Sequence, residues 1–232
     1  YLHLDNSACN LASLNLLAFL DGARNDRFDL EGFRQAVRVV FTAQDILVGN
    51  ADYPTAAIAQ TSRDFRQLGL GYTNLGAMLM ALGLPYNSEP ARAWAGAITA
   101  LMTGEAYATS VDLAQRVGAF SGYSSNSDPM RQVLQLHRDA LNSVSGEAPT
   151  DLVTAARSSW DYVVEGSEKH GVRNSQATVI APTGTISFMM DCDTTGIEPD
   201  LGLIKFKKLV GGGDLTIVNQ TVQRALSCLG YN

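Results

Sequence analysis

The sequence predicts a helix-rich α/β fold in which a few short strands accompany several amphipathic helices. Hydrophobic residues make up 46% of the 232 residues, which is enough apolar surface for a sizeable core. Apolar side chains recur at helical spacing over most of the chain. The apolar segment 176–181 leads directly into a loop rich in Thr, Gly and Pro, which is typical of a short strand followed by a turn.

The N-terminal part predicts a strand followed by helices. The apolar run 11–19 follows Cys9 and predicts a buried strand, or a strand-like segment, that leads to a turn at residues 21–22. Asp29 is a suitable N-cap for an amphipathic helix that ends before Pro54. A short helix should then follow the proline.

The middle of the chain predicts a turn or short strand at residues 68–71 and then a helix that runs to Gly83. Ser88 is a good N-cap for a long helix that Gly118 stops. The 22 residues from 67 to 88 carry no charge, but their glycines and proline favour a buried strand, turn and helix over a membrane span.

The C-terminal half predicts a polar loop at 119–128 and a helix that begins at Pro129, because proline is pre-set for the first helical position. Another helix should run from near Thr150 to Gly171.

The end of the chain predicts a glycine turn followed by a helix. Residues 211–213 are three consecutive glycines, which favour a hinge or a tight turn, although glycines before a helix can also cradle phosphate. Asp214 would then cap a final helix that ends near Leu229.

The charge balance narrows the class of ligand. The chain has 17 basic and 23 acidic residues, a formal net charge of −6. Its longest basic run is Lys207-Lys208, so a polymeric nucleic acid is not an expected partner, and an anionic ligand must be held locally. The three histidines are widely separated and lack metal-ligand spacing, so we expect no metal site.

The three cysteines contain no C-x-x-C pair, which favours a reduced, cytoplasmic setting. Cys9 should sit at the edge of the core, either as a small apolar residue or as a redox group. Cys192 lies between Asp191 and Asp193, whose charges disfavour a thiolate, so we expect a structural residue. Cys228 should be a core residue of the last helix.

Two glycine-containing segments suggest ligand sites. The loop 182–187 places hydroxyls, a glycine and backbone N–H groups after a strand, which suits a phosphate cradle but also an ordinary Ser/Thr-rich turn. It is not a Walker loop, because no Gly-Lys-Ser/Thr follows. The run 69–71 lacks the third glycine of a dinucleotide fingerprint, since Asn74 occupies that place. The polar run 193–199 follows soon after the possible cradle.

Three segments carry a family resemblance. Residues 173–213, RNSQATVIAPTGTISFMMDCDTTGIEPDLGLIKFKKLVGGG, resemble the adenosylcobalamin-dependent, or class II, ribonucleotide reductases. Residues 5–16, DNSACNLASLNL, are similar to the segment just downstream of that family's Asn-Pro-Cys-Ser-Glu motif. Residues 66–71, followed by Leu75-Gly76, fit its Arg-x-x-Gly-Leu-Gly pattern. The resemblance spans the whole chain.

The resemblance implies a fold, a reaction and a site. The fold would be a ten-stranded α/β barrel, of which residues 1–232 form one partial catalytic domain, incomplete at both ends. The enzyme, a ribonucleoside-diphosphate reductase, would reduce ribonucleotides to 2′-deoxyribonucleotides with adenosylcobalamin as cofactor, whose contacts are not assigned. Cys9 matches one of two active-site cysteines that become a disulfide. The substrate phosphates would be bound by Pro182, Thr183, Gly184, Thr185, Ile186 and Ser187.

The resemblance also implies partners. These are a ribonucleotide, a dithiol or thioredoxin-like reductant, and the rest of the reductase chain, with its radical cysteine upstream of Tyr1. The complete enzyme would be a cytoplasmic homodimer without a membrane or nucleic-acid partner. Two alternatives stay open: a large-subunit segment of a cobalamin-independent class I reductase, and a catalytically inactive phosphate-binding module. Whether the substrate is a diphosphate or a triphosphate also stays open.

Overall fold

A computed structural model describes residues 4–20, 27–144 and 146–231 of the chain. The chain forms two compact units, each assembled from three separate stretches. Among the described residues, the first unit contains those within 1–12, 30–71 and 93–180, and the second contains those within 13–29, 72–92 and 181–232. Each unit is described by itself below.

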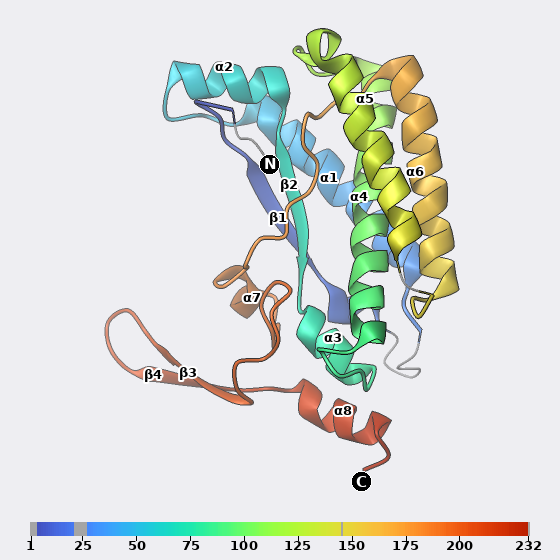
Figure 1. The fold of residues 1–232 in the computed structure, drawn as a ribbon. Helices are drawn as coiled ribbons and strands as arrows, with labels where there is room; N and C mark the ends of the chain where they lie inside the picture. Colours follow the sequence, from blue (N-terminus) through green and yellow to red (C-terminus); the bar gives the residue numbers. More distant parts are fainter. Residues whose placement is uncertain (1–3, 21–26, 145, 232) are drawn as a thin grey trace. The chain divides into compact units, whose positions relative to one another are not determined.

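Two strands that the chain places far apart in sequence pair with one another. Strands β1 (Asn10–Asn15) and β2 (Leu68–Thr73) form a two-stranded sheet (Figure 1). Every residue of β2 is buried, as expected from its uncharged sequence. The prediction of one buried strand over 11–19 was partly wrong. The Asn15 side chain accepts a hydrogen bond from Leu17 N–H, so a 3₁₀ helix (Leu16–Phe19) replaces the second half of the strand.

The first unit is mainly helical, and most of its helices lie where capping residues predict them. The Ser88 hydroxyl accepts a hydrogen bond from Ala91 N–H at 3.3 Å, which confirms its N-cap role. Gly118 and Gly171 end two of the helices with positive φ angles of 88° and 71°. The helices are α1 (Leu30–Asn50), α2 (Ala56–Phe65), α4 (Glu89–Val117, which begins in the second unit), α5 (Tyr123–Ala140) and α6 (Thr150–His170).

Helix α5 begins earlier than the sequence predicts. We expected a loop up to residue 128 and a start at Pro129, but the helix begins at Tyr123 and contains the proline. Tyr123 anchors this early turn. Its ring packs edge-on against the ring of Phe120, with 5.5 Å between the ring centroids, and its hydroxyl donates to the Ser167 carbonyl at 3.0 Å. These two contacts, one with the nearby Phe120 and one with Ser167 on α6, outweigh the local stop signal of a proline in a helix.

The predicted strand at 176–181 is reduced to a single bridge. Leu70 of β2 pairs in parallel with Thr178, through its N–H to the Ala177 carbonyl and through its carbonyl to Val179 N–H, both at 3.0 Å. The strand prediction was therefore wrong in extent, although the segment does run beside β2.

The second unit carries the predicted loop and ends in a hairpin and a helix. Its elements are α3 (Leu75–Ala81), α7 (Ile186–Met189), the antiparallel strands β3 (Ile204–Lys208) and β4 (Asp214–Val218), and α8 (Thr221–Cys228) (Figure 1). Residues 211–213 form the turn of the hairpin, and all three glycines have positive φ. Asp214 pairs with Lys208, so its predicted role as a helix N-cap was wrong. The β-branched residues that follow it suit a strand once β3 is available as a partner.

Among the residues that the structure describes, no helix is long and apolar enough to cross a membrane.

Candidate functional site

Cys9 lies in the first unit, immediately before β1, with its side chain half-buried. The neighbouring Ala8 N–H donates to the Ser62 hydroxyl at 3.1 Å, which ties this segment to α2. Burial raises the pKa of the Cys9 thiol. The group is therefore held as a protonated thiol, which suits the delivery of hydrogen and electrons better than nucleophilic attack.

Gly69 explains how Cys9 packs against β2. A Cβ atom on this glycine would lie 2.6 Å from Leu11 Cδ2, 2.8 Å from Val179 Cγ1 and 3.0 Å from Cys9 Sγ. The glycine thus leaves the room that the cysteine and its neighbours occupy. This packing role of Gly69 was not predicted, because one of its contacts, Val179, lies far away along the chain.

The loop 182–187 lies in the second unit, and its six residues divide into two sets. Thr183 and Ser187 are 7% and 1% exposed, so their hydroxyls point into the protein. The other set, Pro182, Gly184, Thr185 and Ile186, is exposed.

The two buried hydroxyls of the loop meet a third from β2. Thr73 Oγ1 lies 2.8 Å from Thr183 Oγ1 and 3.0 Å from Ser187 Oγ, and the last two atoms are 2.8 Å apart. We call these three side chains the hydroxyl triangle. Gly196 N–H donates to Thr73 Oγ1 at 3.0 Å and to Thr183 Oγ1 at 2.8 Å, which joins the triangle to a second turn.

Thr183 has an unusual backbone conformation. Its φ angle is +56°, in the left-handed region that β-branched residues rarely adopt. Such a conformation persists where the surroundings hold it, and the hydroxyl triangle does so here.

The strained residue is followed by three consecutive exposed N–H groups. The N–H groups of Gly184, Thr185 and Ile186 have no hydrogen-bond partner within the described ranges. A Cβ on Gly184 would meet nothing within 4 Å, so the space beside them is open. Successive N–H groups after a left-handed residue form a concavity that binds anions.

The half-buried Cys192 thiol donates to the Met190 carbonyl at 3.8 Å. Burial raises the pKa of the thiol to about 11, and the charges of Asp191 and Asp193 add to the rise. Hydrogen bonding to Thr73 and Ser187 favours a lower pKa of this thiol. The direction expected from the two aspartates is confirmed, but burial is the larger cause.

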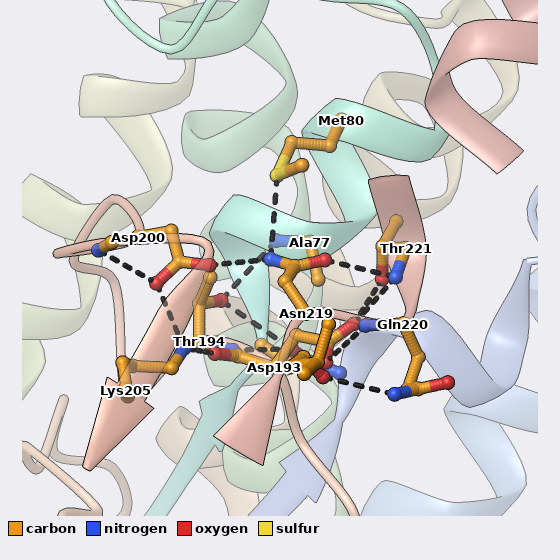
Figure 2. A network of polar contacts seen from close by, with 12 residues as sticks. Ala77, Met80, Asp193, Thr194, Asp200, Lys205, Asn219, Gln220 and Thr221 are labelled. Atoms are coloured by element: carbon orange, nitrogen blue, oxygen red, sulfur yellow. Dashed lines mark hydrogen bonds and ion pairs between the residues drawn. The ribbon is translucent and has the colours of Figure 1, made fainter. Parts of the chain in front are cut away.

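The polar run 193–199 contains the turn at Gly196, and hydrogen bonds to other parts of the chain hold this run in place. Thr194 N–H donates to Asn74 Oδ1 at 3.0 Å, and Ala77 N–H donates to Thr194 Oγ1 at 3.2 Å. The Asp193 carboxylate accepts from Gln220 N–H at 2.9 Å and Thr221 N–H at 2.8 Å, at the start of α8 (Figure 2).

Asp200 extends the same network. Its carboxylate pairs with Lys205 Nζ at 2.7 Å and accepts a hydrogen bond from Asn219 (Figure 2). Hydrogen bonds from Lys205, Asn219 and Gly202 N–H lower the pKa of Asp200 although burial opposes them. Sequence reasoning missed Thr73, because its partners lie more than 100 residues away along the chain.

Cys228 is exposed at the end of α8, so the prediction of a core residue was wrong. All three cysteines are free thiols. Among residues 4–20, 27–144 and 146–231, no group of three His, Cys, Asp or Glu side chains could hold a metal ion.

Comparisons with known proteins agree with the family resemblance. The chain is 56% identical to the vitamin B12-dependent ribonucleotide reductase of Rhodopirellula baltica and 54% identical to that of Streptomyces clavuligerus, and each match covers 100% of this chain. A more distant relative, the ribonucleoside-diphosphate reductase subunit alpha of Chlamydia pneumoniae, is 30% identical over 97% of the chain. The chain spans 22% and 24% of the first two relatives. The ribonucleotide reductase barrel domain family matches residues 1–232. The chain therefore belongs to this family.

Proposed function

We propose that these residues form part of the catalytic domain of an adenosylcobalamin-dependent ribonucleotide reductase, which converts ribonucleotides to 2′-deoxyribonucleotides. The observation that carries the proposal is the row of open N–H groups at residues 184–186. The much higher identity to vitamin B12-dependent relatives than to the Chlamydia relative favours the cobalamin class.

The loop 182–187 would bind the substrate phosphates. The N–H groups of Gly184, Thr185 and Ile186 and the exposed Thr185 hydroxyl can donate hydrogen bonds to phosphate oxygens without a basic side chain. Thr183 and Ser187 would act indirectly, because their hydroxyls already bond one another. A net charge of −6 does not oppose such local binding.

Cys9 would supply reducing equivalents. In the overall reaction the C2′–OH bond breaks, a C2′–H bond forms and the oxygen leaves as water. Two thiols each give up one hydrogen and one bonding electron and join in a disulfide, which balances the two electrons that the substrate gains. Cys9 would be one of these thiols, and its partner would come from another part of the reductase. The raised pKa keeps its hydrogen in place at neutral pH.

Adenosylcobalamin, when bound, would supply the radical that starts the reaction. Because the corrin ring already holds the cobalt, the donor set on this chain is no test of its binding. We assign no residue of the chain to the cofactor. The cofactor class is testable by activity of the whole reductase with and without added adenosylcobalamin. Activity that needs a separate radical-generating subunit instead would favour the class I alternative.

The wider context of the domain belongs to the same proposal. Residues 1–232 would be one part of a ten-stranded α/β barrel within a longer, cytoplasmic, homodimeric reductase. The unpaired backbone edge at Thr178 supports a further strand, since its own N–H and carbonyl have no partner among the described residues. A dithiol or thioredoxin-like protein would reduce the disulfide after each turnover.

The phosphate role is tested at Gly184. Gly184→Asp places a negative charge in open space beside the N–H groups, and Gly184→Asn is the neutral variant of the same shape. In a reductase that contains these residues, we expect KM for the ribonucleotide to be about tenfold higher for the Asp variant than for the Asn variant. Equal KM values for the two variants would contradict the proposal.

The redox role is tested by Cys9→Ser, with Cys228→Ser as the matched control. With a dithiol reductant, the Cys9 variant should lose multiple-turnover formation of deoxyribonucleotide. The Cys228 variant, which changes an exposed thiol at the end of α8, should retain it. Undiminished turnover by Cys9→Ser would remove Cys9 from the mechanism.

A further inference from the structure

We infer that Thr73 is a positioning residue for substrate phosphate binding, because its buried hydroxyl holds Thr183 in the left-handed conformation that opens the N–H groups at 184–186. This inference rests on the proposed phosphate role of the loop. It adds a residue from a different segment, 110 positions away in sequence from the loop residue it contacts.

The position of Thr73 suits this role. It is the last residue of β2 and is 0% exposed. Its Oγ1 atom contacts both ends of the loop, since Thr183 precedes the three open N–H groups and Ser187 follows them. A hydroxyl on a buried strand end is a stiff support, because β-branched side chains have restricted χ1 rotamers.

The same hydroxyl connects the loop to the turn at residues 194–196. Thr73 Oγ1 accepts from Gly196 N–H at 3.0 Å and can donate to the Thr194 carbonyl at 3.4 Å. Removal of this one oxygen would leave the Thr183 hydroxyl bonded to Ser187 and to Gly196 N–H, but without its hydrogen bond to the buried end of β2.

The consequence for the substrate follows from backbone geometry. The peptide plane between Thr183 and Gly184 turns when the φ and ψ angles of Thr183 change. A threonine released from its support would relax toward negative φ, which L-residues prefer. The Gly184 N–H would then turn out of the row that it forms with Thr185 and Ile186. Phosphate affinity should fall while the residues that carry out the chemistry stay unchanged.

The test compares Thr73→Val, which keeps the shape and removes the hydroxyl, with Thr73→Ser, which keeps the hydroxyl. In a reductase that contains these residues, we expect Thr73→Val to raise KM for the ribonucleotide about tenfold and to change kcat by less than about twofold. Thr73→Ser should restore a KM close to that of the unchanged protein. A purely structural role would instead lower the active fraction, and so kcat, at constant KM, and that result would overturn the inference.

Two further measurements keep the test decisive. If Thr73→Val does not yield folded protein, Thr73→Cys, a weaker donor of similar volume, replaces it. A KM for Thr73→Cys that is higher than the KM for Thr73→Ser then supports the inference, and equal KM values for the two variants overturn it. The Gly184→Asp and Gly184→Asn pair separates the two proposals. A difference within that pair together with an unchanged KM for Thr73→Val overturns the role of Thr73 alone, whereas no difference within the pair overturns both.

Discussion

The Sγ atom of Cys9 lies 3.0 Å from the position that a Cβ atom on Gly69 would occupy. The cysteine therefore packs against a strand that has no side chain at the point of contact. Leu11 Cδ2 and Val179 Cγ1 approach the same point at 2.6 Å and 2.8 Å. Residues 9–11 and Val179, from two different segments, thus converge on one glycine, and the placement of the thiol depends on the absence of a side chain at Gly69.

Gly69→Ala should destabilise the fold by about 1–3 kcal/mol, because the added methyl group overpacks this point. Gly49→Ala is the matched control: Gly49 is an exposed residue of α1 with nothing within 4 Å of its Cβ position. There the substitution should stabilise the helix by up to about 1 kcal/mol. Urea denaturation of both variants measures the difference in their free energies of unfolding. Equal stability of the two variants would show that the side chains around Gly69, including Cys9, move aside at no cost in free energy.

The Cys192 thiol should resist alkylation at neutral pH. Its pKa is raised from 9.0 to about 11, so the thiolate that reacts with iodoacetamide is scarce at pH 8. Mass spectrometry should find the exposed Cys228 modified first. Cys192 labelling as fast as that of Cys228 would contradict the burial of this thiol.

The same shift predicts how stability depends on pH. A folded pKa above the unfolded value means that the fold favours the protonated thiol. The contribution of the protonated Cys192 thiol to the stability of the fold is fully present below about pH 9 and is lost as the pH rises through about 11. Cys192→Ala should remove this part of the alkaline destabilisation, which a series of denaturation curves between pH 8 and 11 would measure.

Glu105 should contribute more to stability than its neighbour Glu31. Its carboxylate is 1% exposed and pairs with Arg34 Nε at 2.8 Å and Arg38 Nε at 2.9 Å, and it accepts from the Ser159 hydroxyl at 2.5 Å. Glu105→Gln should cost about 2 kcal/mol, because it leaves two arginines without their buried counter-charge.

Glu31→Gln is the control for that substitution, since Glu31 also pairs with Arg34 but is 78% exposed. Its loss should cost less than about 0.5 kcal/mol. Similar denaturation midpoints for the two variants would argue that the buried pair is no stronger than the exposed one.

Asp193→Asn should loosen the start of α8. The carboxylate accepts from two N–H groups there, and the neutral amide keeps a single oxygen and a weaker hydrogen bond. A loss of about 1 kcal/mol corresponds to roughly fivefold faster hydrogen exchange of the α8 amides. Asp214→Asn, at an exposed position of the hairpin, should leave those amides unchanged. Equal exchange in both variants would show that Asp193 is not the cap.

Local signals predicted the elements that depend on local bonds. The Ser88 cap and the helix-ending glycines at 118 and 171 act within one helical turn, so their effect is visible in the sequence. Two of the wrong predictions concern segments that pair with another part of the chain, which the local sequence pattern does not show. Asp214 became part of a strand because β3 pairs with it, and the helix start moved to Tyr123 because Phe120 and Ser167 hold its ring and hydroxyl.

The candidate site likewise combines features that the local sequence determines with features that depend on tertiary contacts. The sequence by itself determined the family, the position of Cys9 and the composition of the loop 182–187, since these are properties of contiguous residues. Only the tertiary structure decided which loop hydroxyls are buried, why Thr183 is held at positive φ and why residue 69 is a glycine. The physical reason is distance along the chain: Thr73 and Thr183 are separated by 110 positions, and hydrogen bonds between such residues form only when the strands and turns that carry them have packed.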